Sequence, residues 1–271
     1  LSYGEQTVVF KQGSRKKIEA EADKLREWQR LFPSLTPRII ATDRQGDREA
    51  LLREFVSGVL LSDVYTAPGK LEDKLQATRD LFLLTLDIWR VTMQPGKPST
   101  SFAGQVRSRL SEVYAMHPYL EFVSDREGLN DLLDAIAERE QAVQPDFKVW
   151  LHGDFNMNNV VYHDGSVRFI DVHRSAYGDY LADTGVFLVS TVRQPQIDES
   201  VREHMRSICG LVRDYIAAFA REHGDTHCQE RLQMSLARSY LTSARVIVDE
   251  GHARWLFEHG IRLLRKEVPV S

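Results

Sequence analysis

Residues 160–171, VVYHDGSVRFID, restrict the fold more than any other stretch of the chain. Two short runs rich in apolar and β-branched residues flank Asp164 and Gly165, a dipeptide that favours a two-residue turn between antiparallel strands. The stretch therefore predicts a β-hairpin in which His163 pairs with Ser166. This register also determines which residues meet at the open end of the hairpin.

The register brings two oxygen-bearing side chains to that open end. Asn159 precedes the first strand and faces Ile170, and Asp171 ends the second strand. One amide oxygen and one carboxylate suit a hard cation, and Mg²⁺ takes few protein oxygens and leaves its other positions to phosphates and water. Asp154 lies five residues before Asn159, in the loop that leads into the hairpin, and its side chain can project into the same space. The sequence therefore predicts a phosphoryl-transfer site with two metal ligands and one carboxylate that orients an attacking hydroxyl.

Further carboxylates follow the hairpin. Residues 151–187 also include Asp179 and Asp183, and these two, like Asp154, Asn159 and Asp171, lie among apolar residues that predict burial. A buried charge is costly unless it is paired, hydrogen-bonded or bound to a metal. We therefore expect these carboxylates to be buried and held by such partners.

The spacing of these residues resembles the aminoglycoside phosphotransferase and choline kinase-like families, relatives of the protein kinases. The matching residues are His152-Gly153-Asp154, then Asn159, and then Ile170-Asp171. The resemblance implies that Asp154 is the catalytic base and that Asn159 and Asp171 bind Mg²⁺. His152 belongs to the motif and is expected to order the loop and not to bind metal.

Gly178, Asp179 and Asp183 also follow the aminoglycoside phosphotransferase pattern. The resemblance implies that the two aspartates brace the catalytic loop. Asp179 has an alternative interpretation, because it directly precedes an apolar helical stretch and could be only its N-cap.

Lys11 and Glu21 agree with this resemblance. In the kinase fold a strand lysine holds the α- and β-phosphates and pairs with a helix glutamate. Lys11 ends the strand predicted for residues 7–12, and Glu21 borders the buried face of the helix predicted for residues 14–32. The alternative is that Lys11 and Glu21 form only a solvated ion pair, because the sequence around them is rich in charged residues.

The resemblance also implies a hinge and an overall architecture. Backbone near Glu54, Phe55 and Val56 is expected to meet the adenine of ATP, or the base of GTP. The expected fold class is α+β, a two-lobed protein kinase-like fold with a small β-rich lobe over residues 1–56 and a larger helical lobe over 57–271. The expected helices of the second lobe are 71–94, two within 102–143, and the segment from 181 onward with breaks near 194–196 and 222–225.

Two features depart from the family pattern. Only ten residues precede Lys11, and they contain no Gly-rich loop to cover phosphates. Either the phosphates are covered in another way or the natural protein extends upstream of Leu1, and the start without Met favours the extension that we expect. Val172, His173 and Arg174 follow Asp171, where the family often has an aromatic and then an acidic residue. Arg174 could bind an anionic substrate group or a phosphate, or be a surface arginine.

Composition excludes several other classes. The net charge is −4 and no basic stripe contains interleaved aromatics, so no nucleic-acid partner is expected. No apolar run is long enough to span a membrane, and no leader is recognisable. Cys209 and Cys228 form no metal or disulfide pattern, which favours a reducing cytoplasm.

The predicted function is therefore ATP-dependent phosphoryl transfer to a small-molecule hydroxyl acceptor, such as an aminoglycoside, a sugar or an amino alcohol. The alternative is a catalytically inactive kinase-like nucleotide-binding or regulatory module. A protein kinase is disfavoured, because the segment from Asp171 to Asp183 is too short for a regulated activation loop. Trp89, Trp150 and Trp255 could cage a choline-type cation but suit a core equally well.

Overall fold

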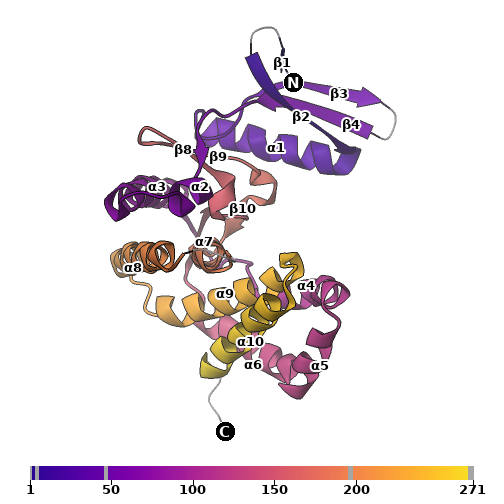
Figure 1. Cartoon of the computed structure of the whole chain (residues 1–271), viewed down its shortest axis with the longest axis vertical. Coiled ribbons are helices and arrows are strands. Elements are labelled where there is room, and N and C mark those ends of the chain that lie inside the picture. The colour runs from indigo at the N-terminus through magenta and orange to yellow at the C-terminus, as the bar shows by residue number, and fades with distance from the viewer. Residues whose placement is uncertain (1, 4–5, 46–47, 195–197, 268–271) are drawn as a thin grey trace. The chain divides into compact units, whose positions relative to one another are not determined.

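The structure is a computed structural model that describes residues 2–3, 6–45, 48–194 and 198–267. The contacts between residues divide the chain, which Figure 1 shows as a whole, into two compact units. The first unit contains residues 1–85 and 152–176, and the second contains residues 86–151 and 177–271. The lobe boundary after residue 56 stays a prediction.

An antiparallel sheet with the strand order β1-β2-β4-β3 begins the first unit. Its strands are β1 (Ser2–Tyr3), β2 (Gln6–Ser14), β3 (Ile39–Gln45) and β4 (Arg48–Glu54). The sequence of residues 1–6 predicts the end of an earlier strand and its turn at residues 4–6, of which residues 4 and 5 lie outside the described residues. Lys11 pairs with Leu51 inside β2, so the prediction that Lys11 ends its strand is wrong. Strand β2 extends beyond its predicted end because its residues pair with β4 as far as Ser14, which pairs with Arg48.

Helix α1 (Arg15–Leu31) follows β2 and contacts this sheet (Figure 1). Ile18, Ala22, Leu25 and Trp28 recur at helical spacing, and all four are buried. Each large apolar side chain buried in this way contributes about 1.5–3 kcal/mol. Glu21 lies on the same buried face, which turns its carboxylate towards the sheet strand that carries Lys11.

The predicted hairpin is confirmed in the first unit. Strands β8 (Val160–His163) and β9 (Ser166–Phe169) pair in the expected register, from His163 with Ser166 to Val160 with Phe169. β5 (Val59–Leu60) adds a third strand on the β8 side. Asp164 and Gly165 both have positive φ angles, as a two-residue turn of this kind requires.

Helices α2 (Leu61–Thr66) and α3 (Leu71–Thr92) follow β5, and α3 closely matches the predicted long helix. An aromatic cluster packs under the hairpin and the loop before it. Its members are Trp28, Phe82, His152, Phe155 and Phe169. The loop that carries Asp154 therefore rests on a close-packed base.

The second unit is mainly helical. It contains α4 (Phe102–Met116), α5 (Tyr119–Arg126), α6 (Leu129–Val143), α7 (Tyr180–Val192), α8 (Glu199–Glu222), α9 (Cys228–Ser243) and α10 (Glu250–Glu267). The prediction of two helices within 102–143 is wrong. Three form, because the chain turns at Pro118 and again at Gly128, whose φ is 62°.

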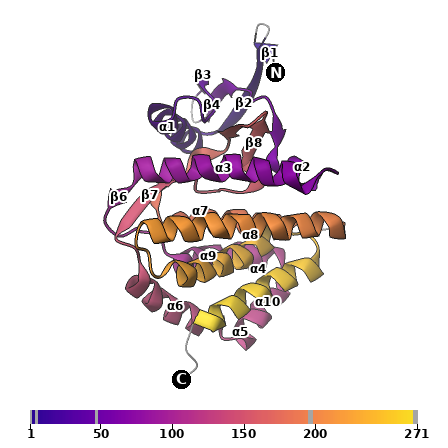
Figure 2. The same cartoon turned by 90° about the vertical axis from the view of Figure 1, so that its left-hand side faces the viewer.

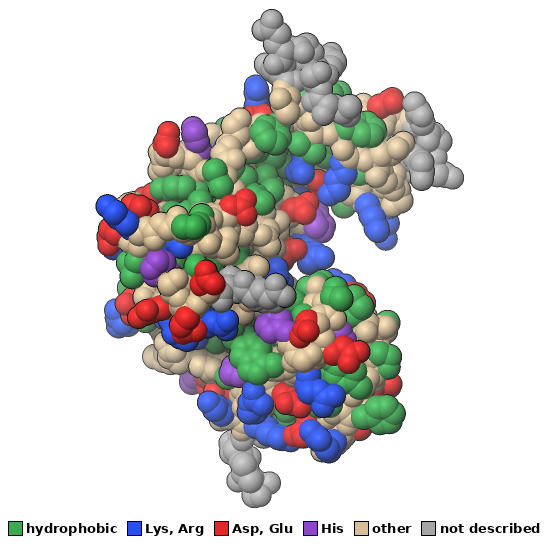
Figure 3. All heavy atoms as spheres, in the orientation of Figure 1, with side chains coloured by type: hydrophobic (Ala, Val, Ile, Leu, Met, Phe, Trp, Pro, Cys, Tyr) green, Lys and Arg blue, Asp and Glu red, His purple; other side chains and the backbone are tan. Residues whose placement is uncertain are grey.

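Helix α9 lies at the centre of the second unit and packs against α4, α7 and α10 (Figure 2). A small sheet joins β10 (Ala176–Gly178), β7 (Phe147–Leu151) and β6 (Gln94–Pro95) in that order. Within the described residues, no helix has the length and the apolar composition needed to cross a membrane. On the face shown in Figure 3, side chains of both charge signs are interspersed.

Candidate active site

The loop from His152 to Asn159 links β7 to the hairpin and carries the predicted base. It ends in a short 3-10 helix, η1 (Met157–Asn159). Asn156 caps η1, because its Oδ1 accepts the N–H of Asn158 at 3.0 Å. Its Nδ2 donates to Asp154 Oδ1 at 3.1 Å. Asn156 thus fixes both the turn of the loop and one oxygen of Asp154, and this role was not expected from the sequence.

His152 connects this loop to the end of the hairpin. Its Nδ1 accepts the backbone N–H of Asp154 at 3.3 Å, which assigns the proton to Nε2, and Nε2 donates to the carbonyl of Ile170 at 3.1 Å. Burial lowers the pKa of His152 to about 4, so the imidazole is neutral near pH 7. The prediction that His152 orders the loop agrees with these contacts.

Gly153 allows the backbone of the catalytic loop to approach the backbone of the segment that follows Asp171. Its φ is 84°, and a Cβ added there would fall on the backbone carbonyl group of Arg174. Arg174 belongs to the 3-10 helix η2 (Val172–Arg174), which directly follows Asp171. Only glycine combines this backbone angle with this contact, so the loop and η2 are held together at their backbones.

The two predicted metal ligands lie at the open end of the hairpin. The backbone N–H of Ile170 donates to the carbonyl of Asn159 at 3.0 Å, as the predicted register requires. Asn159 is buried and its Nδ2 donates to the carbonyl of Asp154 at 2.9 Å, which leaves its Oδ1 as the free ligand atom. Asp171 has a left-handed backbone with φ 60°, an uncommon conformation for a non-glycine residue.

Lys11 reaches this end of the hairpin. Its Nζ lies 2.5 Å from Glu21 Oε2 and 3.4 Å from Asp171 Oδ1. Arg53 lies 3.7 Å from the other oxygen of Glu21, so this buried carboxylate faces two cations. Partial burial opposes ionisation of Asp171, but the nearby charges, that of Lys11 above all, hold its pKa below the usual value. The structure thus brings Lys11, Glu21 and Asp171 together.

A second connection ties α1 to the catalytic loop. The indole N–H of Trp28 donates to Ser175 Oγ at 2.7 Å, and Ser175 Oγ donates to the carbonyl of His152 at 3.0 Å. Both side chains are buried. The helix that carries Glu21 is therefore anchored to the residue that begins the catalytic loop.

The burial expected for the carboxylates is only partly correct. Asp179 and Asp183 are 2% exposed, whereas the side chains of Asp154 and Asp171 are 28% and 43% exposed. A carboxylate that binds a ligand must be accessible, and hydration removes much of the cost of its charge. The prediction that these two are buried is therefore wrong.

Arg174 lies against the predicted base. Its Nη1 donates to Asp154 Oδ2 at 3.1 Å. Both oxygens of Asp154 therefore accept a hydrogen bond, one from Asn156 and one from Arg174. From the sequence, a substrate anion, a phosphate or a surface position was expected for Arg174, and the ion pair with Asp154 was not.

The predicted hinge residues have different environments. Arg168 binds both oxygens of Glu54, at 2.7 and 3.1 Å, and lowers the pKa of that carboxyl to about 2. Phe55 is exposed and Val56 is buried. The contact of their backbone with adenine stays a prediction.

Asp179 and Asp183 belong to the second unit. Asp179 caps α7, because its Oδ1 accepts the N–H of Leu181 at 2.9 Å, so the N-cap interpretation is confirmed. Its other oxygen accepts the Nε of buried Arg231 at 2.8 Å. Arg231 also binds both oxygens of Asp225, at 2.8 and 2.7 Å. The role of Asp179 and Asp183 in bracing the catalytic loop stays a prediction.

The donor set at the hairpin end fits a hard divalent cation. It consists of one amide oxygen and one ionised carboxylate, and oxygen atoms are the ligands that Mg²⁺ prefers. Among the described residues, no cluster of three or more His, Cys, Asp or Glu side chains could hold a metal. A cation bound by Asn159 and Asp171 would therefore need further oxygens from water or from a phosphate ligand.

Solved structures of known kinases share this fold. An aminoglycoside-3′-phosphotransferase of type VIII is 17% identical, with 97% of this chain and 86% of that chain covered and a TM-score of 0.52. The choline kinase of Cryptosporidium parvum Iowa II is 14% identical, with 92% and 78% covered and a TM-score of 0.54. Amicoumacin kinase hAmiN is also 14% identical, with 98% and 84% covered and a TM-score of 0.58.

Sequence comparison reaches the same group. No curated protein sequence matches the chain at a significant level. The profile of the phosphotransferase enzyme family (APH) matches residues 2–222, which is most of the chain. The mixed α+β, kinase-like architecture and the HGD loop with its hairpin agree with that match. The chain therefore belongs to the phosphotransferase enzyme family.

Proposed function

We propose that the chain is an ATP-dependent phosphotransferase that moves the γ-phosphate to a hydroxyl group of a small molecule. One observation carries the proposal: the ammonium group of Lys11 lies between Glu21, at 2.5 Å, and Asp171, at 3.4 Å. A lysine held in this way can bind nucleotide phosphates beside the carboxylate that would hold a metal. Family membership supports the same class of reaction.

Asn159 and Asp171 are the residues that would hold Mg²⁺. The carboxylate of Asp171 is half-exposed, and its lowered pKa keeps it ionised at neutral pH. When bound, Mg²⁺ would neutralise charge on the phosphates. Amicoumacin kinase hAmiN was solved with AMP-PNP and Ca²⁺, which supports a nucleotide and a divalent cation for this chain. The same groups could bind the phosphates of GTP.

Asp154 would orient the acceptor hydroxyl and take its proton. Asn156 and Arg174 each donate to one of its oxygens, which fixes the plane of the carboxylate. Each carboxylate oxygen can accept more than one hydrogen bond, so a hydroxyl can still bind. Such a base contributes on the order of 10²- to 10⁴-fold to the rate.

Small hydroxylated molecules are the proposed acceptor class, with aminoglycosides, sugars and amino alcohols as the candidates. The names of the similar structures support this breadth, because they include an aminoglycoside phosphotransferase, a choline kinase and an amicoumacin kinase. Two of the three tryptophans considered for a choline cage, Trp89 and Trp150, are only 1% and 2% exposed and pack in the core, so they cannot contact a ligand.

A catalytically inactive nucleotide-binding module is the second candidate. The ion pair between Arg174 and Asp154 favours it, because it engages the predicted base with a cation of the chain itself. Turnover separates the two candidates: an inactive module would bind Mg²⁺-ATP and consume none of it with any acceptor.

The test measures nucleotide consumption, with ATP and with GTP, against a panel of aminoglycosides, sugars, amino alcohols and nucleosides. Asp154→Asn should lower kcat by about 10²- to 10⁴-fold and leave Mg²⁺-ATP affinity nearly unchanged. Asp171→Ala should abolish Mg²⁺-dependent ATP binding. Asp164→Asn is the matched control, since this exposed turn residue lies at the other end of the hairpin. Equal loss of ATP binding in the Asp154 and Asp171 variants would refute the assigned roles.

A further inference from the structure

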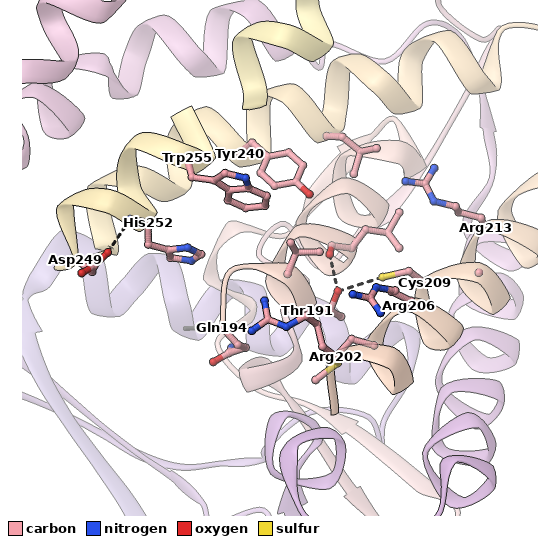
Figure 4. Close-up of a pocket in the computed structure, with 15 residues that line it drawn as sticks. Thr191, Gln194, Arg202, Arg206, Cys209, Arg213, Tyr240, Asp249, His252 and Trp255 are labelled. Atoms are coloured by element: carbon pink, nitrogen blue, oxygen red, sulfur yellow. Dashed lines mark hydrogen bonds between the residues drawn. The ribbon is translucent and has the colours of Figure 1, made fainter. Parts of the chain in front are cut away.

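The second unit contains a cavity of about 970 Å³ that the proposed catalytic residues do not line (Figure 4). Its walls come from α7, α8, α9 and α10, which all belong to this unit. The volume lies in the range of cavities that enclose an organic molecule of moderate size. Much of the lining is apolar, including Leu188, Val192, Met205 and Leu236.

Aromatic rings form one part of the wall. His252 and Trp255 of α10 line the cavity, and the rings of His252 and of His259, which is not a lining residue, stack on the indole within 18° of parallel. Tyr240 of α9 meets the indole edge-on at 6.1 Å, and Figure 4 shows the two rings side by side. Trp255 is nevertheless 41% exposed, whereas the other three tryptophans of the chain are at most 2% exposed. Trp255, which lines the cavity, therefore keeps part of its surface exposed although histidine rings stack on it.

Positive charge reaches the cavity from α8. Arg202, Arg206 and Arg213 line it, and among the described residues Asp249 is the one carboxylate in the lining. Asp249 is already engaged at the start of α10, where its Oδ1 accepts the N–H of His252 at 2.7 Å. The cavity therefore has an excess of cationic side chains.

The three arginines are not equivalent. Arg202 and Arg206 share Glu199, at 3.4 and 2.9 Å. For Arg213, no carboxylate within the described part of the chain lies within 4 Å of the guanidinium. Its charge acts on Cys209 and Tyr240, two other lining residues. Arg213 is therefore the cation that is available to an anionic ligand.

We propose that this cavity binds an organic anion with a flat apolar body, an aryl carboxylate or a similar aryl acid. The apolar and aromatic walls would hold the body, with the exposed part of Trp255 and the ring of Tyr240 as its aromatic contacts. Arg213 would pair with the acid group, and a guanidinium offers two parallel donors to a carboxylate. A cationic ligand of the same shape is disfavoured by the excess of arginine.

The proposal concerns binding and stands apart from the proposed phosphoryl transfer, so either can fail alone. Calorimetry on the full chain compares 2-naphthoate with neutral 2-naphthamide and cationic 2-naphthylmethylammonium. The expected result is saturable binding of the naphthoate, with binding of the other two at least tenfold weaker. Equal binding of the amide, or no binding of the naphthoate, would overturn the proposal.

Variants assign the binding to the cavity. Arg213→Gln should weaken naphthoate binding at least tenfold, whereas Arg221→Gln, an exposed arginine on the same helix outside the cavity, should leave it unchanged. Gly210 lines the cavity, and a Cβ added there meets no atom within 4 Å. Gly210→Leu should therefore obstruct the cavity and raise helix propensity together. It should reduce binding without lowering the melting temperature, and unchanged binding in both cavity variants would contradict the assignment.

Discussion

His152 and Asp154 are joined by a hydrogen bond in which the backbone N–H of Asp154 donates to the imidazole Nδ1. The other ring nitrogen of His152 donates to Ile170, the residue before Asp171. One neutral side chain therefore positions the proposed base relative to a proposed metal ligand. Protonation would remove the acceptor at Nδ1, so the connection depends on pH.

The first prediction concerns stability below pH 6.5. The pKa of His152 is lowered from 6.5 to about 4 by burial, so only the unfolded chain binds a proton between these values. The free energy of unfolding should fall as the pH decreases through this window, with a contribution of up to about 3 kcal/mol from His152. Urea unfolding from pH 4 to 7 measures it.

The variant His152→Gln should lose this part of the pH dependence, although it also lowers stability at pH 7. His163→Gln is the control, because this histidine is exposed in the hairpin turn and should leave the slope unchanged. An identical pH slope in the wild type and in His152→Gln would contradict the prediction.

The second prediction concerns Gly153→Ala. The added methyl group would fall on the carbonyl group of Arg174 and would also strain a backbone with φ 84°. The loop and η2 must then separate, which displaces Asp154 and Asp171 together. We expect kcat to fall at least tenfold and Mg²⁺-ATP affinity to fall as well. Gly96→Ala is a control for the backbone strain alone, because its φ is also positive and a Cβ there meets no atom within 4 Å.

The hairpin shows how much of this site follows from sequence. The register of β8 and β9 was predictable because a two-residue turn fixes it, and the placement of Asn159 and Asp171 follows from that register. The pairing of Lys11 with Glu21 was expected only through the family resemblance. Local patterns do not determine which strand and helix pack together.

Features outside the hairpin differ in how far the sequence indicates them. Trp28 and Ser175 are far apart in the chain, and their hydrogen bond exists only because α1 packs against η2. Asn156 could have been suspected, since an amide before a short helical turn is a typical cap. The third helix within 102–143 did have a signal, because Pro118 and Gly128 are residue types that interrupt helices.

The third prediction concerns Arg231→Met. Arg231 is 1% exposed and binds Asp179, Asp225 and the carbonyl of Val143. Its removal leaves two carboxylates in the core of the second unit without their cation, so the free energy of unfolding should fall by about 3–5 kcal/mol. Denaturant unfolding measures the loss. Arg221→Met, exposed on α8, should change stability by less than about 0.5 kcal/mol, and a loss that small for Arg231→Met would refute the prediction.

The last prediction separates the roles of the carboxylates around Lys11. Glu21→Gln keeps the shape of the side chain but removes the charge that holds the Lys11 ammonium at 2.5 Å. Lys11 is already 3.4 Å from Asp171, so it should move towards that remaining carboxylate. Lys11 would then bind the phosphates less well, and Asp171 would be less available to a metal.

ATP affinity should therefore fall about tenfold in Glu21→Gln, and the Mg²⁺ concentration needed for half-maximal ATP binding should rise. Glu19→Gln is the matched control, since Glu19 lies on the same helix and pairs with Arg15 on the exposed face. Calorimetric titration with ATP at several Mg²⁺ concentrations measures both effects. If Glu21→Gln weakens ATP binding without any change in the Mg²⁺ dependence, Lys11 acts on the nucleotide alone and its contact with Asp171 has no part in metal binding.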